Sequence, residues 1–258
     1  MPDSLHLVKI PLRPDRLIAI ARSRALPLRN LDDGYLCHCV MREMWQGRAP
    51  APFVLRRNGR TLDVWGYTGS DARALVDHAR AFGDPSLLAA ISDLDHVASK
   101  RMPLFDVGRR LGFLLRACPV VRLARATDGH KIGAEVDAFL ARCFAVGREV
   151  AVSREQVYRE WIIAKVNQPE MTGVAVDGVR VSAMSRERLV RRTQGSERKA
   201  RHLERPDVRF EGELVVVDGQ RFHEWLAHGV GRHRAFGFGA LILVPPANGS
   251  TRLRQGQC

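Results

Sequence analysis

The sequence predicts an α+β protein made of two units in tandem, and three observations predict this class. The chain has 258 residues, enough for one large domain or two small domains that each bury a core. Helical and strand patterns alternate along most of the chain. The first half follows the order strand, helix, hairpin, helix, strand, which is the order of a split βαβ, ferredoxin-like unit.

Local signals define the elements of the first unit. Asp32 and Asp33 can cap its second helix, and Pro27 ends the first one. The Asn58-Gly59 turn between strand-forming residues indicates a hairpin. In chain order we expect a strand over 5–10, helices over 15–26 and 35–45, a hairpin over 52–68, a helix over 70–82, a helical insertion over 85–98 and a strand over 108–124.

A short polar segment at 128–134 is expected to link the units, which gives domains 1–127 and 135–258. No residue-level repeat is visible between them. An Asp177-Gly178 turn predicts a second hairpin. After the linker we expect helices over 134–147 and 153–168, then the hairpin over 174–192, a strand over 209–218, a helix over 220–230 and a last strand over 240–246.

The charge balance of the chain is strongly basic. Lysine and arginine number 41 against 28 acidic residues, a formal charge of +13, and the excess is mainly arginine. Arginine donors suit phosphates and guanine edges, so this charge favours a nucleic acid as partner, with an arginine-rich codon usage as the alternative explanation. The irregularly spaced cysteines and the lack of a long apolar run predict a cytoplasmic protein without structural zinc or a membrane span.

The segment GVGRHRAFGFGALIL at 229–243 joins glycines and basic side chains to the last strand. It lacks the Lys-Ser/Thr of a P-loop and follows a helix, which argues against a dinucleotide site. Glycines allow positive φ, so backbone amides can face an anion while basic side chains supply charge; a tight connection whose glycines only pack is the alternative. The candidate RNA-binding residues here are Gly229, Gly231, Arg232, His233, Arg234, Gly237 and Gly239.

This glycine-rich loop resembles that of the CRISPR RNA-processing endoribonucleases of the RAMP superfamily, most closely their CasE branch. FLLRACPVVR at 113–122, which contains Arg116 and Arg122, is similar to a CasE strand, and both arginines are candidate RNA contacts. Tyr35 and His38 repeat the CasE spacing of a tyrosine three residues before the active-site histidine. The resemblance implies cleavage of precursor CRISPR RNA within repeats, at the base of a stem-loop, with 2′,3′-cyclic phosphate and 5′-hydroxyl products. The related processing enzymes of type IV systems are an alternative branch.

RNA carries its own nucleophile, the 2′-hydroxyl, so a nuclease can cut it without a metal by aligning the attack, moving protons and stabilising charge. We expect His38 to act as general acid or base and Tyr35 to position the phosphate, from one face of a helix; a packed core histidine is the alternative. No metal or cofactor is expected. The arginines expected to stabilise charge are Arg22, Arg24, Arg29 and Arg42.

The segment 184–207 is rich in arginine and has a Gly195-Ser196 tip. Such a basic hairpin can lie along an RNA stem, and the resemblance implies that it grips the repeat stem-loop; a solvated loop is the alternative. We also expect a subunit of a CRISPR ribonucleoprotein complex, and the rival function is a non-catalytic RNA-binding subunit. The expected contacts are Arg186, Arg188, Arg191, Arg192, Arg198, Lys199 and Arg201.

Overall fold

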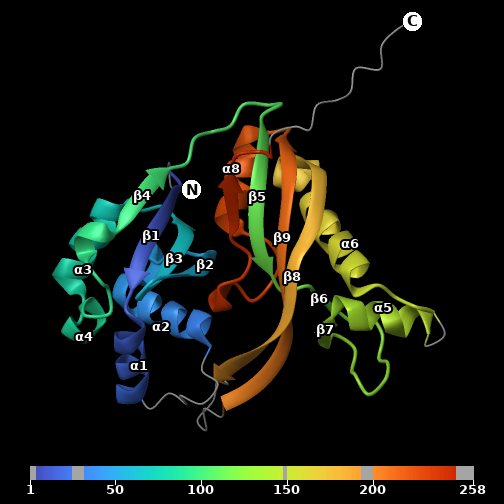
Figure 1. Cartoon of the computed structure of the whole chain (residues 1–258), viewed down its shortest axis with the longest axis horizontal. Helices are drawn as coiled ribbons and strands as arrows, with labels where there is room; N and C mark the ends of the chain where they lie inside the picture. The colour runs from blue at the N-terminus through green and yellow to red at the C-terminus, as the bar shows by residue number, and fades with distance from the viewer. Residues whose placement is uncertain (1–3, 25–31, 148–149, 193–199, 248–258) are drawn as a thin grey trace, which may run out of the picture.

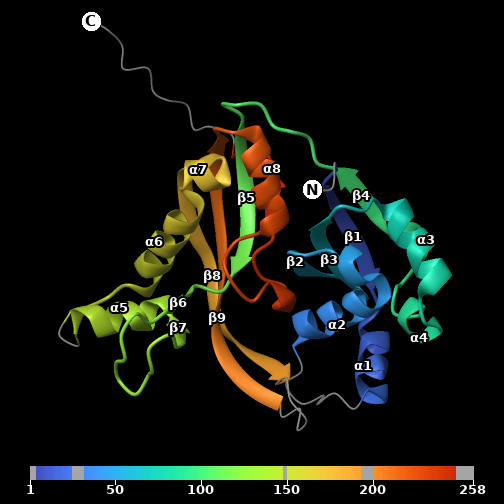
Figure 2. The same cartoon turned by 180° about the vertical axis from the view of Figure 1, so that it is seen from behind.

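A computed structural model describes residues 4–24, 32–147, 150–192 and 200–247 of the chain. Two antiparallel sheets stand side by side, the first built from β1 to β4 and the second from β5, β8, β9 and β10 (Figures 1 and 2). Helices pack on one face of each sheet and enclose a separate apolar core. Among the described residues, no helix is both long enough and apolar enough to cross a membrane.

The first unit closes its core with helices α1, α2 and α3, which bury apolar residues against strands β1 and β3. Its sheet has the order β2-β3-β1-β4. The elements are β1 (His6–Leu12), α1 (Pro14–Ser23), α2 (Asp33–Trp45), η1 (Gln46–Arg48), β2 (Phe53–Asn58), β3 (Thr61–Thr68), α3 (Ala72–Phe82), α4 (Pro85–Leu88), η2 (Leu94–His96) and β4 (Ala98–Arg101).

The second unit packs α6 and α8 on its four-stranded sheet, which has the order β10-β5-β9-β8. A separate pair, β6 and β7, lies beside it. The elements are β5 (Arg110–Ala117), β6 (Val120–Arg122), β7 (Glu135–Asp137), α5 (Ala138–Val146), α6 (Arg154–Val166), α7 (Pro169–Thr172), β8 (Val174–Arg192), β9 (Ala200–Val216), α8 (Gly219–His228), η3 (Arg234–Phe236) and β10 (Leu241–Val244).

Both sheets have the same topology. Within each unit the strands lie in the order fourth, first, third, second, and every pair of neighbours is antiparallel. This is the ferredoxin-like arrangement, so the α+β class with two such units in tandem is confirmed. The short helices α4 and η2 form the helical insertion of the first unit.

The strand expected over 108–124 was assigned to the wrong sheet. β5 pairs with β9 and β10 of the second sheet, whereas β4, which the sequence pattern did not reveal, completes the first sheet beside β1. Strand periodicity reports which residues alternate but not which distant strand they pair with. The pairing favours a boundary between β4 and β5 over the predicted linker at 128–134, which lies between the paired strands β6 and β7.

The turn predicted at Asp177-Gly178 is also wrong, because β8 runs without a break through these residues. β9 supplies hydrogen-bonding partners along almost the whole strand, and a register shift between Val176 and Gly178 absorbs the extra residue as a β-bulge. Beyond the last residue of β9 that pairs with β5, Val208, residues 185–192 of β8 and 200–207 of β9 continue as a two-stranded extension. This β8–β9 extension curves toward the end of the molecule where α1 and α2 lie (Figures 1 and 2).

A small third apolar cluster joins the two units. It is centred on Phe236 and Phe238 in the loop between α8 and β10, and it takes in residues from α2, from the strand pair β8–β9, from the connection after β5 and from the start of β6. Its members are Tyr35, Cys118, Val120, Leu189, Leu203, Ala235, Phe236 and Phe238. The helix α2 is thereby fixed to the glycine-rich loop.

The approach of α2 to this loop leaves no space for a side chain at Gly34. A Cβ atom there would lie 2.2 Å from the carbonyl oxygen of Phe236. Glycine to alanine within a helix ordinarily stabilises by up to about 1 kcal/mol, but overpacking at a closed contact costs about 1–3 kcal/mol. We therefore expect Gly34→Ala to lower the free energy of unfolding, measured by urea denaturation.

Gly47→Ala is the matched control, because no heavy atom lies within 4 Å of a Cβ atom built at that position. We expect this variant to unfold at the urea concentration of the wild type or above it. Equal stability of the Gly34 and Gly47 variants would contradict the close packing of α2 on the loop.

Candidate active site

The helix α2 begins with a buried carboxylate. Asp32 is its N-cap, and the Asp32 Oδ1 atom accepts a hydrogen bond from the Tyr35 amide at 2.7 Å, as the sequence predicted for this position. Burial raises the pKa of the Asp32 carboxyl to about 6, although the bond from Tyr35 and the charge of Arg116 oppose the shift. The start of the helix therefore depends on a group that titrates near neutral pH.

Tyr35 and His38 lie one turn apart on α2. The ring of Tyr35 stacks on Phe236 of the glycine-rich loop, with centroids 5.4 Å apart and planes inclined by 21°. His38 is half-buried, and burial lowers its pKa, with a further lowering from the charge of Arg42. The imidazole is therefore neutral at neutral pH and able to accept a proton.

The arginines expected near this helix have different environments. Arg42 is exposed on α2, four residues after His38, and its positive charge lowers the pKa of His38. Arg24 is engaged by Glu43 of α2, with Nη2 and Oε1 2.6 Å apart. Arg22 is exposed on α1, and Arg29 lies outside the described residues. Among the described members of this set, Arg42 is the one whose charge acts on the pKa of His38.

The backbone of the glycine-rich loop has the conformation that its sequence predicted. Gly229, Gly231, Gly237 and Gly239 all have φ between 75° and 85°, a region that favours glycine. The Gly239 amide donates to the Arg116 carbonyl at 2.8 Å, which ties the loop to β5. The conformation is compatible with both readings of the loop, tight packing and the presentation of amides to an anion.

The basic side chains of the loop are held from within the protein. Arg232 and His233 both contact Glu135 of β7, each with a nitrogen–oxygen distance of 2.6 Å. Arg234 Nη1 donates to the His228 carbonyl at the end of α8. The sequence pattern placed Glu135 in the helix expected over 134–147, which is wrong, because Glu135 lies on β7 and the helix α5 begins only at Ala138. Nothing in the local pattern shows that this strand lies beside a loop almost a hundred residues later.

Arg116, an expected RNA contact, lies in an internal ion pair. Its guanidinium donates to both carboxylate oxygens of Asp207, at 3.0 and 2.9 Å, and lies 4.3 Å from the ring centroid of Phe238. Glu187 lies 3.7 Å away, and 16% of the Arg116 side chain is exposed. Burial opposes the charge, but these carboxylates outweigh it and raise the Arg116 pKa. Contact with RNA stays a prediction for this residue.

A cleft of about 1070 Å³ separates the two units near this pair. The start of α2, the hairpin β2–β3 and the strands β5, β8 and β9 line it. Arg188 lies at the cleft and is exposed, and Arg186 pairs with Glu204 at 3.5 Å. Arg122 is exposed on β6. The side chains of Arg191, Arg192 and Arg201 lie outside the described part of the structure, as do residues Arg198 and Lys199.

Among the described residues, no three histidine, cysteine or acidic side chains come together as a metal site.

A model of the protein family described as "CRISPR associated protein" matches residues 5–245, which is nearly the whole chain. The chain belongs to this family. No curated protein sequence matches this CRISPR-associated protein.

The fold of this CRISPR-associated protein is similar to that of several solved structures. The CRISPR endoribonuclease Cse3 bound to a 19-nucleotide RNA has a TM-score of 0.62 and 24% identity, over 94% of this chain and 100% of that one. Cse3 of Thermus thermophilus, bound to an RNA that represents a pre-cleavage complex, has a TM-score of 0.56 and 20% identity with the same coverage. Cas6e of Escherichia coli K-12 has a TM-score of 0.51 and 16% identity, also with this coverage.

The buried cap makes the stability of the protein depend on pH. Because the Asp32 pKa is about 6 in the folded state and ordinarily 3.8, the folded protein retains a proton that the unfolded chain has lost. Its contribution to the free energy of unfolding therefore decreases as pH rises between these values. Asp32→Asn removes this titration and keeps a capping side chain. We expect the free energy of unfolding of the variant, relative to that of the wild type, to increase by roughly 2 to 3 kcal/mol between about pH 4 and about pH 7.

Urea unfolding of both proteins at a series of pH values measures this difference. Asp71→Asn is the control, since Asp71 caps α3 in the same way but is exposed. Parallel curves for wild type and Asp32→Asn would contradict a raised pKa at the start of α2.

Proposed function

We propose that this chain is a metal-independent endoribonuclease that cuts precursor CRISPR RNA within each repeat, at the base of a stem-loop. The observation that carries the proposal is the docking of α2, with Tyr35 and His38, on a glycine-rich loop next to the β8–β9 extension. Membership of the CRISPR-associated family supports it, as does a fold similar to that of an endoribonuclease solved with bound RNA.

The reaction needs three contributions at the scissile phosphate. The 2′-hydroxyl attacks phosphorus and forms the 2′,3′-cyclic phosphate, while the bond to the 5′-oxygen breaks and that oxygen takes a proton from water and leaves as a hydroxyl. His38, neutral at neutral pH, accepts the proton of the attacking hydroxyl. The Tyr35 hydroxyl positions the phosphate, and the charge of Arg42 offsets the negative charge of the transition state.

Affinity comes from exposed basic residues outside the reacting centre. Arg186 and Arg188 lie exposed on β8, and phosphates of a stem-loop are the natural partners of such a row of guanidinium groups. An RNA held in this way remains bound after the cut. The chain is then a subunit of a CRISPR ribonucleoprotein that keeps its own product.

The proposal is tested by incubating the protein in EDTA with a labelled transcript of the repeat from its own genome. A parallel reaction uses the same RNA with a 2′-deoxy nucleotide immediately upstream of the cut. A single cut that survives EDTA and disappears with the deoxy substitution would support the proposal. Tight binding without cleavage would contradict it and would favour a non-catalytic RNA-binding subunit.

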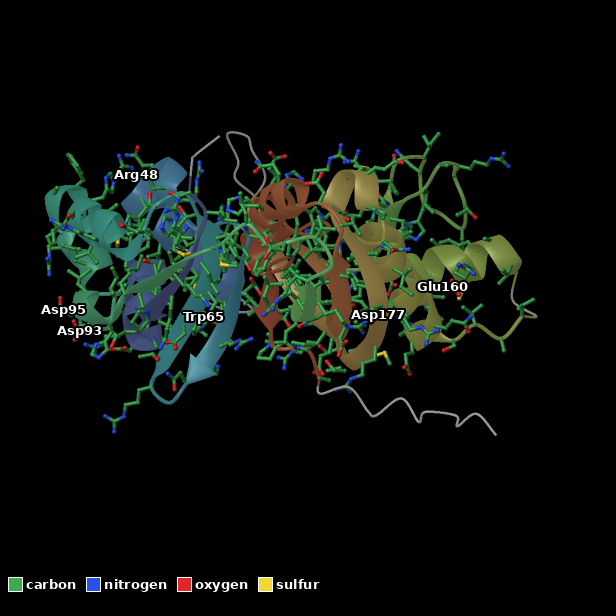
Figure 3. All side chains as sticks on the ribbon, turned by 90° about the horizontal axis from the view of Figure 1, so that it is seen from above. Arg48, Trp65, Asp93, Asp95, Glu160 and Asp177 are labelled. Carbon is green, nitrogen blue, oxygen red and sulfur yellow. The ribbon has the colours of Figure 1, made fainter. Side chains whose placement is uncertain are left out.

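Loss of the imidazole should slow cleavage without loss of binding. We expect His38→Ala to lower the single-turnover rate about 10²- to 10⁴-fold, the usual contribution of general acid–base catalysis. The wild-type rate should fall as pH drops through a pKa below 6.5, because protonated His38 cannot accept the proton. His96→Ala is the control, since His96 is exposed beside Asp93 and Asp95 at the outer end of the first unit (Figure 3). A near-wild-type rate for His38→Ala would exclude the histidine mechanism.

The β8–β9 extension should contribute to the salt dependence of RNA binding. Each phosphate contact adds slightly less than one to the slope of log Kd against log salt concentration. If Arg186 and Arg188 each meet a phosphate, replacing both with glutamine should lower this slope by about 2. The control is the double variant Arg73→Gln/Arg80→Gln on α3, which removes the same charge from exposed sites. Equal slopes for the two double variants would contradict a role of the extension in RNA binding.

A further inference from the structure

Glu135 lies where three parts of the second unit meet. It belongs to β7, and its side chain contacts Arg205 of β9 and two residues of the glycine-rich loop, Arg232 and His233. Its cross-strand partner on β6 is Arg122. Three of these four basic residues, Arg122, Arg232 and His233, were expected from the sequence to contact RNA.

The contacts of Glu135 are short and divide between its two oxygens. Oε1 accepts a hydrogen bond from His233 Nε2 at 2.6 Å and one from Arg205 Nε at 3.2 Å. Oε2 lies 2.6 Å from Arg232 Nε. Burial of Glu135 by itself favours the neutral acid, but His233, Arg205 and Arg232 outweigh it and lower the pKa to about 2. Glu135 is therefore an anion at every physiological pH.

The three partners differ in exposure. Arg205 and His233 are largely buried, with 16% and 14% of their side chains exposed, whereas 46% of the Arg232 side chain is exposed. Arg232 meets Glu135 through Nε, and nearly half of its side chain stays exposed. A guanidinium fixed on one side in this way is available to a phosphate on the other.

Contacts also lead from Glu135 to the helix α2. His233 has φ of 62°, in the left-handed region that non-glycine residues seldom adopt. The His233 carbonyl accepts a hydrogen bond from the Phe236 amide at 2.8 Å. The rings of His233 and Phe236 meet edge to face, with centroids 6.0 Å apart. Phe236 in turn stacks on Tyr35. Glu135 thus supports the turn on which the candidate catalytic helix rests.

We infer that Glu135 is a positioning residue for RNA cleavage, which presents Arg232 to a phosphate of the RNA and holds His233 in the turn that supports Phe236 and Tyr35. The inference rests on the proposed function. It makes an acidic side chain within a basic surface necessary for RNA binding. Electrostatics alone gives the opposite expectation, because removal of a negative charge should strengthen binding to RNA.

The test compares Glu135→Gln with Glu160→Gln. Glu160 lies on α6, pairs with Arg142 at an exposed site, and is far from the first unit in Figure 3, so its variant changes the net charge equally and leaves the loop intact. The dissociation constant is measured with repeat RNA that carries the 2′-deoxy substitution, and the single-turnover rate with cleavable RNA. For Glu135→Gln we expect about tenfold to a hundredfold weaker binding and a rate lower by about a hundredfold. Glu160→Gln should bind as well as the wild type or better.

Coupling to Arg232 separates positioning from a general loss of structure. If Glu135 acts on binding through Arg232, Glu135→Gln should weaken RNA binding much less in an Arg232→Gln background than in the wild type. Glu135→Asp, which keeps the charge on a shorter side chain, should restore part of the binding. Arg232 is half-exposed, so its own variant tests the same contact even if Glu135→Gln unfolds.

Three results would overturn the inference: tighter binding by Glu135→Gln, behaviour equal to that of Glu160→Gln, or full additivity with Arg232→Gln. In each of them a wild-type protein that still cuts the repeat leaves the proposed function standing. A wild-type protein that neither binds nor cuts the repeat would remove the proposed function, and the inference with it.

Discussion

The packing of Phe236 and Phe238 between the two units is the contact on which the rest of the candidate site depends. Both rings are buried, and they touch the helix α2, the strand pair β8–β9 and the connection after β5. The helix α2 carries the tyrosine and histidine, the strands β8 and β9 carry the basic extension, and the connection follows directly after Arg116 at the end of β5. One small apolar cluster therefore sets the position of groups that lie far apart in the sequence.

The positive charge that the site offers to a ligand depends on which basic side chains are already paired with carboxylates of the protein. The chain has a formal charge of +13, but much of the positive charge around the candidate site is paired: Arg116 with Asp207 at the cleft, and Arg205, Arg232 and His233 with Glu135 at the glycine-rich loop. Buried charges are tolerated when carboxylates meet them with good geometry. These pairs fix the loop and the strands, which leaves exposed arginines such as Arg188 to meet an anion from solution.

The sequence predicted those features that depend on neighbouring residues. The cap at Asp32, the helix that carries Tyr35 and His38, and the positive φ of the loop glycines follow from local chemistry, and the structure has them. Two features that depend on distant pairing were predicted wrongly. The sheet to which β5 belongs depends on β9 and β10, and the continuity of β8 past Asp177 depends on β9. Glu135 and the Arg116 ion pair could not be found from sequence, because both exist only as contacts between separate elements.

The central claim is that the scissile phosphate is held between α2 and the glycine-rich loop. The most direct measurement is the structure of the complex with a repeat RNA that carries a 2′-deoxy nucleotide at the cut. The account predicts the scissile phosphate within hydrogen-bonding reach of His38, with Arg232 at a neighbouring phosphate. A phosphate bound inside the cleft beside Arg56 and Arg209, away from His38, would contradict it.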